Sequence, residues 1–492
     1  MTAGVAAIVG GGVIGAGWAA RFLLNGWDVR VFDPEPASRA RVEEIVDNAR
    51  AALPGLGDVS LPAEGTLTFC KLMSEAVSGA DWIQESVPER LELKQKIYQA
   101  LQEHVKPEAI LASSTSGFTP TELQAYSNRP GQIIVAHPFN PVYLLPVVEV
   151  VASERNAPDL VDRALTALTG IGMSPLKIRG EIAAHVADRL LEAVWREALW
   201  LVKDSIATTQ EIDDAIRLGF GLRWAQMGLF ETYRIAGGTG GMAQFLAQFG
   251  PALQWPWTKL MDVPKLDDAL VQRIAGQSDA QSGHMSIEAL ERQRDRNLVG
   301  IMRALMHENW GAGAIQKARD TERETLIGLP RSMDAVADLA QPVLTVDRAV
   351  PLDWLDYNGH MTEARYLHAF GNATDRIMLI LGVDEEYLAS SGSYFTVETH
   401  IRHIDEARAG APMQIFTRVL EGAGKRLHLW HEMYSGERLL ATGEHMLLHV
   451  DLQTRRASDP APHLAANLAR LAEGHAGLPR PDGAGRHVGQ SR

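Results

Sequence analysis

The chain has 492 residues, of which 46% are hydrophobic and 22% charged, as is ordinary for a globular protein. Its length predicts about three domains. The formal net charge of −14 argues against binding to nucleic acid or to an anionic membrane surface.

Cysteine content and hydropathy indicate the cellular compartment of the protein. The single cysteine, Cys70, excludes an internal disulfide and a cysteine-based metal site, and it fits a reducing compartment. No apolar run reaches membrane-spanning length, and the first predicted strand begins too close to Met1 to leave room for a signal peptide. We therefore expect a cytoplasmic protein with no membrane partner.

The segment Gly4–Pro34 has the pattern of a strand, a glycine-rich turn, a helix and a second strand. Its glycines form the motif G-x-G-x-x-G-x-G, between an apolar run suited to a buried strand and a helix that stops at Asn25-Gly26. The expected elements are the strand Val5–Val9, the glycines Gly10, Gly12, Gly15 and Gly17, the helix Ala16–Leu24 and the strand Asp28–Phe32.

This pattern is typical of a dinucleotide-binding unit. The first glycine allows a tight turn, the second lets the backbone approach a pyrophosphate, and the third lets the helix pack on the strand. Asp33 follows where a carboxylate would bond the ribose 2′-hydroxyl and repel a 2′-phosphate, which favours NAD over NADP. A glycine-rich turn in an ordinary α/β protein and an FAD enzyme are the alternatives. The expected cofactor contacts are Gly10, Gly12, Val13, Ile14, Gly15 and Asp33.

Four further apolar runs alternate with helices as far as Gly170. Such alternation predicts a parallel, doubly wound sheet, which binds its ligands at the carboxyl ends of the strands. Polar clusters follow three of these runs, at Glu85–Glu89, Ser113–Gly117 and His137–Pro141. The expected strands are Asp81–Ile83, Ala109–Ala112, Gln132–Ala136 and Val147–Val151, and the expected helices run up to Leu101 and over Leu160–Gly170.

Two further domains are expected after residue 180. Residues 181–320 read as a helical substrate and dimerisation domain, and residues 321–342, which have no sustained pattern, as a linker. Residues 343–455 combine one helix with a run of strands and predict a compact α+β domain. The tail, 456–492, is rich in Pro, Gly, Arg and Ala, and we expect it to be disordered. The expected elements are the helices Ile182–Ser205, Thr209–Leu218, Ser286–Ala318 and Thr362–Leu381, and the strands Val343–Val346, Tyr394–Ile401, Pro412–Leu420, Leu427–Tyr434 and Leu439–Val450.

Several motifs up to about residue 318 resemble the 3-hydroxyacyl-CoA dehydrogenase family. They are SSTSG (Ser113–Gly117), HPFNPV (His137–Val142), the glutamate of VVEVV (Glu149) and ESVPERLELK (Glu85–Lys94). The resemblance implies a Rossmann NAD-binding domain over residues 1–180, followed by an all-α C-terminal domain. It also implies that Glu89, Lys94 and Ser116 lie around the nicotinamide ribose.

Oxidation of a secondary alcohol requires a base for the hydroxyl proton, and histidine has the side chain whose pKa lies nearest the working pH. By the resemblance, the histidine that serves as this base in the family is His137 in this chain. Glu149 would fix its tautomer and stabilise the imidazolium, and Ser116 would hydrogen-bond the substrate oxygen. The alternative is that His137 only ends a strand next to Pro138.

Two departures from the family pattern point to a smaller substrate. Asp188, in HVADRLLEAVWREAL (His185–Leu199), replaces the usual asparagine of the second domain, and the region between Asp33 and Asp81 is shorter than the helical arm that holds CoA. Both resemble the branch acting on small free hydroxy acids, which includes the L-carnitine dehydrogenases. Asp188 would then place negative charge near the trimethylammonium cation or near His137. Aromatic side chains suit such a cation, and the candidates are Phe139, Tyr143, Trp195, Phe220, Trp224, Phe230 and Tyr233.

The C-terminal domain resembles hot-dog thioesterases of the 4-hydroxybenzoyl-CoA type. The resemblance rests on DYNGHM (Asp356–Met361) and on the helix and strands after it, although Met361-Thr362-Glu363 replaces the usual continuation. It implies that helix N–H groups polarise a thioester carbonyl and that Asp356 acts as nucleophile or general base. We expect His360 to bond locally. The pairs His400/His403 and His428/His431 point to opposite strand faces, so no metal site is expected.

The presence of both domains in one chain suggests that their two reactions belong to the same metabolic route. It implies NAD, L-carnitine and an acyl-CoA as the small-molecule partners, a betainyl-CoA ester being the acyl-CoA that fits the same route, and both folds commonly associate as homodimers. Two alternatives stay open: a dehydrogenase for 3-hydroxyacyl-CoA or an L-gulonate-like acid, and a hot-dog domain that only dimerises or binds ligand.

Overall fold

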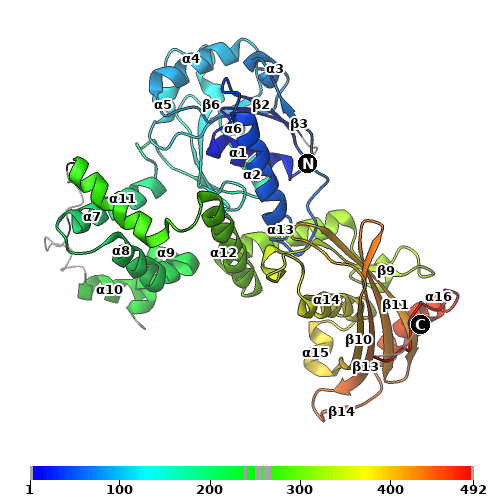
Figure 1. Ribbon diagram of the computed structural model, residues 1–492. Helices are drawn as coiled ribbons and strands as arrows, with labels where there is room; N and C mark the ends of the chain where they lie inside the picture. Colours follow the sequence, from blue (N-terminus) through cyan, green and yellow to red (C-terminus); the bar gives the residue numbers. More distant parts are fainter. Residues whose placement is uncertain are drawn as a thin grey trace. The chain divides into compact units, whose positions relative to one another are not determined.

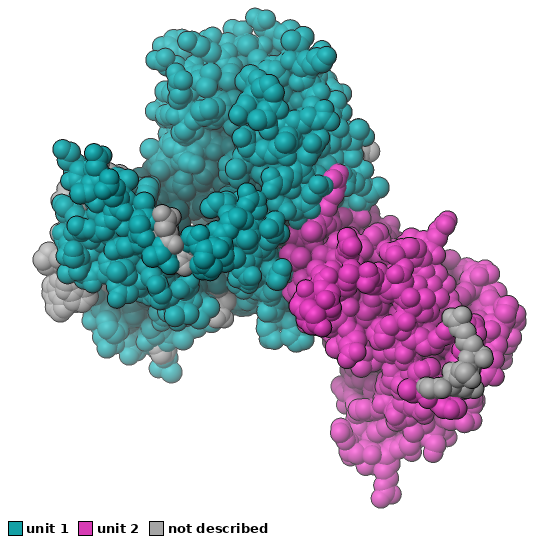
Figure 2. Space-filling model, in the orientation of Figure 1, with its two compact units in different colours: residues 1–49, 62–316 teal, residues 50–61, 317–492 magenta. Residues whose placement is uncertain are grey.

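The computed structural model describes residues 4–237, 239, 241–249, 258, 265 and 267–488. It forms two compact units: unit 1 comprises residues 1–49 and 62–316, and unit 2 comprises residues 50–61 and 317–492 (Figure 2). Within the described ranges, every helix is too short or too polar to span a lipid bilayer.

Unit 1 is built on a sheet with the strand order β3-β2-β1-β4-β5-β6-β7-β8 (Figure 1). The strands are β1 (Val5–Val9), β2 (Asp28–Phe32), β3 (Leu67–Phe69), β4 (Trp82–Glu85), β5 (Ile110–Ser113), β6 (Ile133–Pro138), β7 (Val147–Val151) and β8 (Ser174–Lys177). The helices between them are α1 (Val13–Leu23), α2 (Ser38–Ala52), α3 (Met73–Val77), α4 (Leu91–Gln102), α5 (Pro120–Leu123) and α6 (Pro158–Gly170).

The Rossmann fold is confirmed, with one correction at the edge of its sheet. Strands β1 to β6 pair in parallel, and β4, β5 and β6 are buried along their whole length. The prediction of a fully parallel sheet is wrong at β7, which runs antiparallel to β6. The physical reason is the short connection, residues 139–146, because a parallel crossover needs a dozen or more residues. The strands β3 and β8 lack long apolar runs and were not expected.

The helical part of unit 1 follows β8. The first helix was expected from Ile182 but begins at Ala187, because Ala184 and His185 have positive φ angles of 60° and 48° that no α-helix accommodates. The helices are α7 (Ala187–Lys203), α8 (Thr209–Ala215) with a π-helical turn (Ile216–Phe220), α9 (Gly221–Ala236), α10 (Gly241–Phe249), α11 (Asp268–Ser282) and α12 (Ile287–His307).

Unit 2 contains the hot-dog fold, in which a long helix packs on an antiparallel sheet. The strand order is β10-β13-β12-β11-β9, and the short strand β14 pairs with β13 (Figure 1). Helix α14 buries Phe370, Ile377 and Leu381 against this sheet. The elements are β9 (Val343–Ala349), α14 (Glu363–Leu381), α15 (Glu385–Ser390), β10 (Gly392–His403), β11 (Pro412–Ala423), β12 (Arg426–Ser435), β13 (Arg438–Asp451), β14 (Arg456–Ala457) and α16 (Pro462–His475).

The predicted linker, 321–342, is wrong in its first part. Helix α13 (Gly311–Ile327) continues into it, and Glu324 forms ion pairs with Arg376 of α14 at 2.6 Å and with Arg331 at 2.7 Å. Further along, Met333 is buried in the core of unit 2. Ion pairs stabilise this helix end. It was not predicted because its sequence has no apolar residues at helical spacing.

The prediction of a disordered tail is also wrong, because residues 462–475 form helix α16. Leu464, Leu468 and Leu471 recur at helical spacing and are fully buried in the core of unit 2. His475 accepts a hydrogen bond from the Val419 N–H at 3.0 Å. Burial of this leucine stripe outweighs the Pro- and Gly-rich composition that favoured disorder.

Residues 50–61, expected within the first domain, belong to unit 2. The guanidinium of Arg348 on β9, only 1% exposed, forms an ion pair with Asp58 and donates to the Gly57 carbonyl at 3.1 Å. It also lies over the Trp354 ring, 4.9 Å from the centroid. A buried guanidinium requires such partners. Residues 50–61 therefore supply the charge and the hydrogen-bond acceptor that Arg348 needs.

A chain of polar side chains runs through the core of unit 2, between α14 and the sheet. The Thr417 hydroxyl lies 2.8 Å from the Thr345 hydroxyl and 2.8 Å from Nδ1 of His431. The Thr374 hydroxyl lies 3.2 Å from Nε2 of His431 and 3.4 Å from Nδ1 of His445. Burial lowers the pKa of His445 from 6.5 to about 4 and, with the neighbouring His445, holds the pKa of His431 well below its usual value.

These histidines predict that unit 2 loses stability in acid. Their pKa values are lower in the folded than in the unfolded chain, so their contribution is complete above pH 6.5 and is lost as the pH falls towards 4. For His445 the loss is on the order of 3 kcal/mol over this window. His445→Gln should therefore flatten the pH dependence of unfolding, measured by calorimetry on the full chain. His463→Gln, an exposed control on α16, should leave the slope unchanged, and equal slopes for all three proteins would contradict the prediction.

Candidate active site

The turn from β1 to α1 has the geometry that a dinucleotide requires. Gly10 has a φ of 102°, and a Cβ at Gly15 would lie 1.9 Å from the Gly10 carbonyl oxygen, so neither position accepts another residue without strain. At Gly12 a Cβ would meet nothing within 4 Å, and no side chain caps the first turn of α1. Its N–H groups are therefore available to an anion.

A cavity of about 600 Å³ opens beside this turn. Its lining includes Gly10, Gly12, Asp33, Ser86 and Val87, which follow β1, β2 and β4, and these strands are neighbours in the sheet. The Asp33 carboxylate accepts hydrogen bonds from the Gly11 N–H at 2.6 Å and the Glu35 N–H at 2.7 Å. The residues present therefore fit NAD, with the diphosphate at the helix N-terminus and Asp33 near a ribose.

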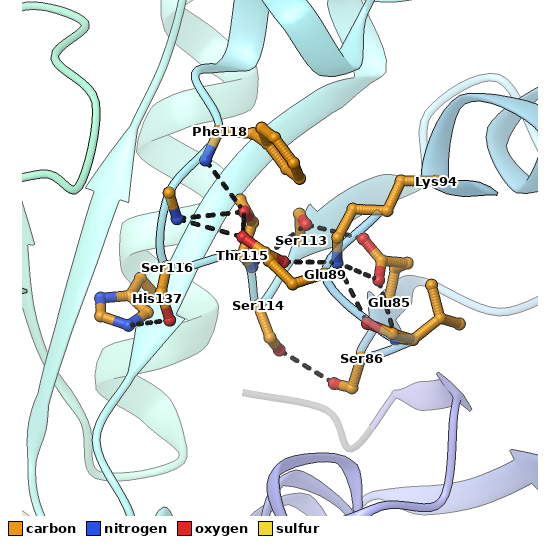
Figure 3. Close-up of polar contacts among 12 residues, drawn as sticks. Glu85, Ser86, Glu89, Lys94, Ser113, Ser114, Thr115, Ser116, Phe118 and His137 are labelled. Atoms are coloured by element: carbon orange, nitrogen blue, oxygen red, sulfur yellow. Dashed lines mark hydrogen bonds and ion pairs between the residues drawn. The ribbon is translucent and has the colours of Figure 1, made fainter. Parts of the chain in front are cut away.

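A buried ion-pair network supports the other side of the crevice (Figure 3). The Lys94 ammonium, 1% exposed, contacts Glu85 Oε1 at 2.7 Å, the Val87 carbonyl at 3.3 Å and Glu89 Oε2 at 3.3 Å. These three oxygens occupy its N–H donors, so Lys94 holds in place Glu89 and the backbone of Val87, which lines the cavity.

Glu89 holds the turn that carries Ser116. Its Oε1 accepts hydrogen bonds from the Thr115 hydroxyl and from the Gly117 N–H, the latter at 3.1 Å (Figure 3). Burial would raise the pKa of Glu89, but the Thr115 hydroxyl, the Lys94 charge and the Gly117 N–H outweigh it and lower the pKa. The Glu89 carboxylate is therefore ionised, and its two hydrogen bonds fix the turn on either side of Ser116.

His137 and Glu149 are direct partners across the antiparallel β6–β7 pair. His137 Nδ1 lies 3.0 Å from Glu149 Oε2, and both side chains are buried. The other carboxylate oxygen accepts the N–H groups of Val186 and Ala187, at 2.9 and 3.0 Å, at the start of α7. Burial would raise the pKa of Glu149, but the bonds from His137, Ala187 and Val186 outweigh it and lower the pKa.

Two polar side chains converge on the other nitrogen of His137. Ser116, which is exposed, places its hydroxyl 3.1 Å from Nε2 (Figure 3), and Asp188, in the first turn of α7, places Oδ2 3.7 Å from the same atom. Because ionised Glu149 accepts at Nδ1, the hydrogen of the neutral ring lies on Nδ1 and Nε2 holds the lone pair. This arrangement can take a proton from an alcohol.

His185 lies beside this group and was not among the expected site residues. It is fully buried, and its ring centroid lies 5.5 Å from that of His137. The sequence signal was a histidine three residues before Asp188, at the start of the motif His185–Leu199, of which only Asp188 was considered as a site residue.

The aromatic candidates do not gather around His137. The Phe139 ring lies 5.0 Å from the His137 ring, whereas the Tyr143 hydroxyl, buried in the core, donates to the Asp295 carboxylate. Phe220 pairs with Trp224 at 4.5 Å. The remaining candidates, Trp195 on α7 and Phe230 and Tyr233 on α9, lie on the helical part of unit 1.

In unit 2, Asp356 lies in a tight turn that leads into α14. Its Oδ1 accepts the N–H groups of Asn358 at 2.8 Å and His360 at 3.3 Å, and Gly359 has a φ of 80°. Burial would raise the pKa of Asp356, but these N–H groups outweigh it and lower the pKa. His360 Nε2 lies 3.1 Å from Glu406 Oε1.

Known protein families match three separate parts of the chain. Residues 5–182 match the NAD binding domain of 3-hydroxyacyl-CoA dehydrogenase, residues 185–273 match the C-terminal domain of the same enzyme, and residues 350–468 match the thioesterase-like superfamily.

Individual relatives cover most of the chain. An L-carnitine dehydrogenase/betainyl-CoA thioesterase of Ruegeria pomeroyi is 62% identical over 98% of this chain and 99% of its own length. An L-carnitine dehydrogenase of Mesorhizobium japonicum is 56% identical over 63% of this chain and 87% of its own length. The crystal structure of a 5-formyl-3-hydroxy-2-methylpyridine 4-carboxylic acid 5-dehydrogenase, an NAD⁺-dependent dismutase, is 27% identical with a TM-score of 0.52, over 62% of this chain and 99% of its own.

Fold, site and matches together define an NAD-dependent dehydrogenase of the 3-hydroxyacyl-CoA dehydrogenase class, joined to a thioesterase-like unit. Because the Ruegeria relative matches over nearly the whole of both chains, the chain belongs to the family of L-carnitine dehydrogenase/betainyl-CoA thioesterases.

The buried ion pair predicts a large difference between two lysines of the same helix. Lys94→Ala leaves the Glu85 and Glu89 carboxylates without their ammonium and should destabilise the protein by about 3 kcal/mol. Lys96→Ala, at an exposed position two residues along α4, should change stability by less than about 0.5 kcal/mol. Urea denaturation of both variants measures the difference, and equal stabilities would contradict this role of Lys94.

Proposed function

We propose that the chain oxidises the 3-hydroxyl of L-carnitine to 3-dehydrocarnitine with NAD, and that unit 2 hydrolyses a CoA thioester, betainyl-CoA. The observation that carries the first activity is the His137 ring, with Glu149 on one nitrogen and Ser116 and Asp188 at the other, in a unit with an NAD site. The names of the relatives support the choice of both substrates.

In the proposed reaction, His137 is the general base. The Ser116 hydroxyl hydrogen-bonds the substrate oxygen and holds the alcohol against Nε2, which accepts the hydroxyl proton. Glu149 keeps the ring in the required tautomer and stabilises the imidazolium as it forms. NAD, when bound, accepts the hydride from the substrate carbon.

Asp188 provides a second negative charge at the reacting nitrogen. It lies 3.7 Å from Nε2, where it stabilises the imidazolium and favours a substrate with a cationic head group over one without. Phe139, whose ring packs against His137, is the aromatic candidate best placed to contact that cation.

For the thioesterase activity, we propose Asp356 as the reactive carboxylate. Its two backbone donors keep it ionised and fixed in front of α14, where it acts on the thioester as nucleophile or activates water as general base. The first N–H groups of α14, which no side chain caps, would polarise the thioester carbonyl. Water and thioester yield the free acid and the CoA thiol.

We also propose a cytoplasmic homodimer. The single cysteine suits a reducing compartment, and the helical part of unit 1 exposes large apolar side chains, among them Leu190, Leu191 and Trp195 on α7. Exposed patches of this kind mark protein interfaces. Sedimentation at the mass of one chain would contradict the dimer.

A substrate panel tests the proposed oxidation directly. L-Carnitine should support NADH formation, followed by absorbance, whereas L-gulonate and 3-hydroxybutyryl-CoA should give less than about 1% of its kcat/KM, because a site built for a charged group rejects analogues that lack it. Activity restricted to the CoA ester would overturn the carnitine assignment.

Asp188→Asn should lower kcat/KM for L-carnitine about tenfold, because it removes a charge next to the reacting nitrogen. Glu192→Gln, which removes a charge one turn along the same helix, serves as the matched control. An equal loss with L-3-hydroxybutyrate, which lacks the cation, would assign Asp188 to His137, and a loss confined to L-carnitine would assign it to the cation. No change with either substrate excludes both roles.

Asp356→Asn should reduce hydrolysis of betainyl-CoA by at least about a hundredfold, because an amide neither attacks the thioester nor accepts a proton from water. Release of the CoA thiol, detected with a thiol reagent, measures this, and NADH formation with L-carnitine should not change. Asp334→Asn, at an exposed position, is the control. Full hydrolysis by the Asp356 variant would mean that unit 2 does not use this residue.

A further inference from the structure

His185 has a strained backbone conformation and lies next to His137, the proposed general base. It is fully buried, and both it and Ala184 have positive φ angles, 48° and 60°. A residue other than glycine adopts this strained backbone conformation only where surrounding contacts determine it. The contacts of His185 indicate what this position achieves.

The first contact fixes the tautomer of the ring. His185 Nε2 lies 3.2 Å from the backbone carbonyl oxygen of Thr115, and because a carbonyl only accepts, Nε2 carries the hydrogen. Burial and the nearby His137 lower the pKa of His185 and outweigh the Thr115 carbonyl, Glu149 and Asp188, which raise it, and this favours the neutral ring. Nδ1 then holds a lone pair, and it is buried without a hydrogen-bond partner. The ring therefore acts only as a donor to Thr115.

Thr115 directly precedes Ser116, and its turn is held from two sides. On one side, Glu89 binds the Thr115 hydroxyl and the Gly117 N–H. On the other, the Ala184 N–H donates to the Gly117 carbonyl at 3.2 Å, and His185 donates to Thr115. The backbone on both sides of Ser116 is thus hydrogen-bonded to Glu89, which follows β4, and to Ala184 and His185, which precede α7.

The same short segment also reaches the other side of His137. The next two residues, Val186 and Ala187, donate their N–H groups to Glu149, and Asp188 follows one residue later. Residues 184–188 therefore contact the Ser116 turn and hold the carboxylate behind His137.

We propose that His185 is a positioning residue for the oxidation: its bond to the Thr115 carbonyl fixes the Ser116 hydroxyl at Nε2 of His137. The inference rests on the proposed alcohol oxidation, because it assigns a role within that site. His185 does not exchange a proton with the substrate. It acts through Ser116, so its loss should change the rate of the chemical step more than the binding of NAD.

Two substitutions separate the hydrogen bond from the volume of the ring. His185→Phe keeps a ring but removes the donor, and it should lower kcat with L-carnitine about ten- to a hundredfold, as small misplacements of a catalytic group do. The KM for NAD should change less than about twofold. His185→Gln retains an N–H near the position of Nε2 and should recover most of the rate. Wild-type kcat in the Phe variant, or no recovery in the Gln variant, would overturn the proposal.

A double-mutant cycle keeps the proposal testable if one variant folds poorly. In a Ser116→Ala background, His185→Gln and His185→Phe should have almost the same kcat, because the group that they position is gone. Additive losses would contradict a role through Ser116. Thioester hydrolysis by unit 2 of the same preparations reports on intact protein. If the wild type itself forms no NADH with L-carnitine, the proposed function fails before any variant is compared.

Discussion

The dehydrogenase site depends on a single carboxylate, that of Glu149, which is satisfied from two directions. On one side it accepts the Nδ1 hydrogen of His137, and on the other it accepts two N–H groups at the start of α7. A helix start has N–H groups without partners and a positive dipole end. Joining these groups to Glu149 keeps the carboxylate ionised and buried, and it also places Asp188 Oδ2 3.7 Å from Nε2 of His137, the proposed proton acceptor. The helical part of unit 1 thus completes a site that the sheet alone leaves open.

Much of this site was predictable from residue types and their order. The glycine motif, Asp33 and the polar clusters after the strands led to the cofactor crevice, and His137, Glu149 and Ser116 were identified by resemblance. The contact between His137 and Glu149 was expected, but the antiparallel register that makes them cross-strand neighbours was not, because every strand was taken as parallel. The short connection 139–146 contained the information, since it leaves no room for a crossover helix. His185 was missed because its bond to Thr115 joins residues 70 positions apart.

In unit 2, the errors concern segments whose stability comes from distant partners. Helix α16 lies in a stretch of Pro- and Gly-rich composition, yet its three leucines complete the core. The end of α13 depends on ion pairs with Arg376 and Arg331, and residues 50–61 depend on Arg348. Local pattern reports propensity and amphipathicity, whereas such contacts form only after the chain has folded. Strands β11 to β13 begin and end within three residues of the expected bounds, because each is a continuous strand-like run between turns.

The most direct test of the account is the rate of hydride transfer in Glu149→Gln. With its carbonyl oxygen at the N–H groups of Val186 and Ala187, the amide would donate to Nδ1 of His137 and force the hydrogen onto Nε2, which then no longer accepts a proton. Single-turnover NADH formation from L-carnitine should fall by about 10³- to 10⁴-fold, while NAD affinity and thioester hydrolysis stay within twofold. A transfer rate close to that of the wild type would contradict His137 and Glu149 as the proton-accepting pair.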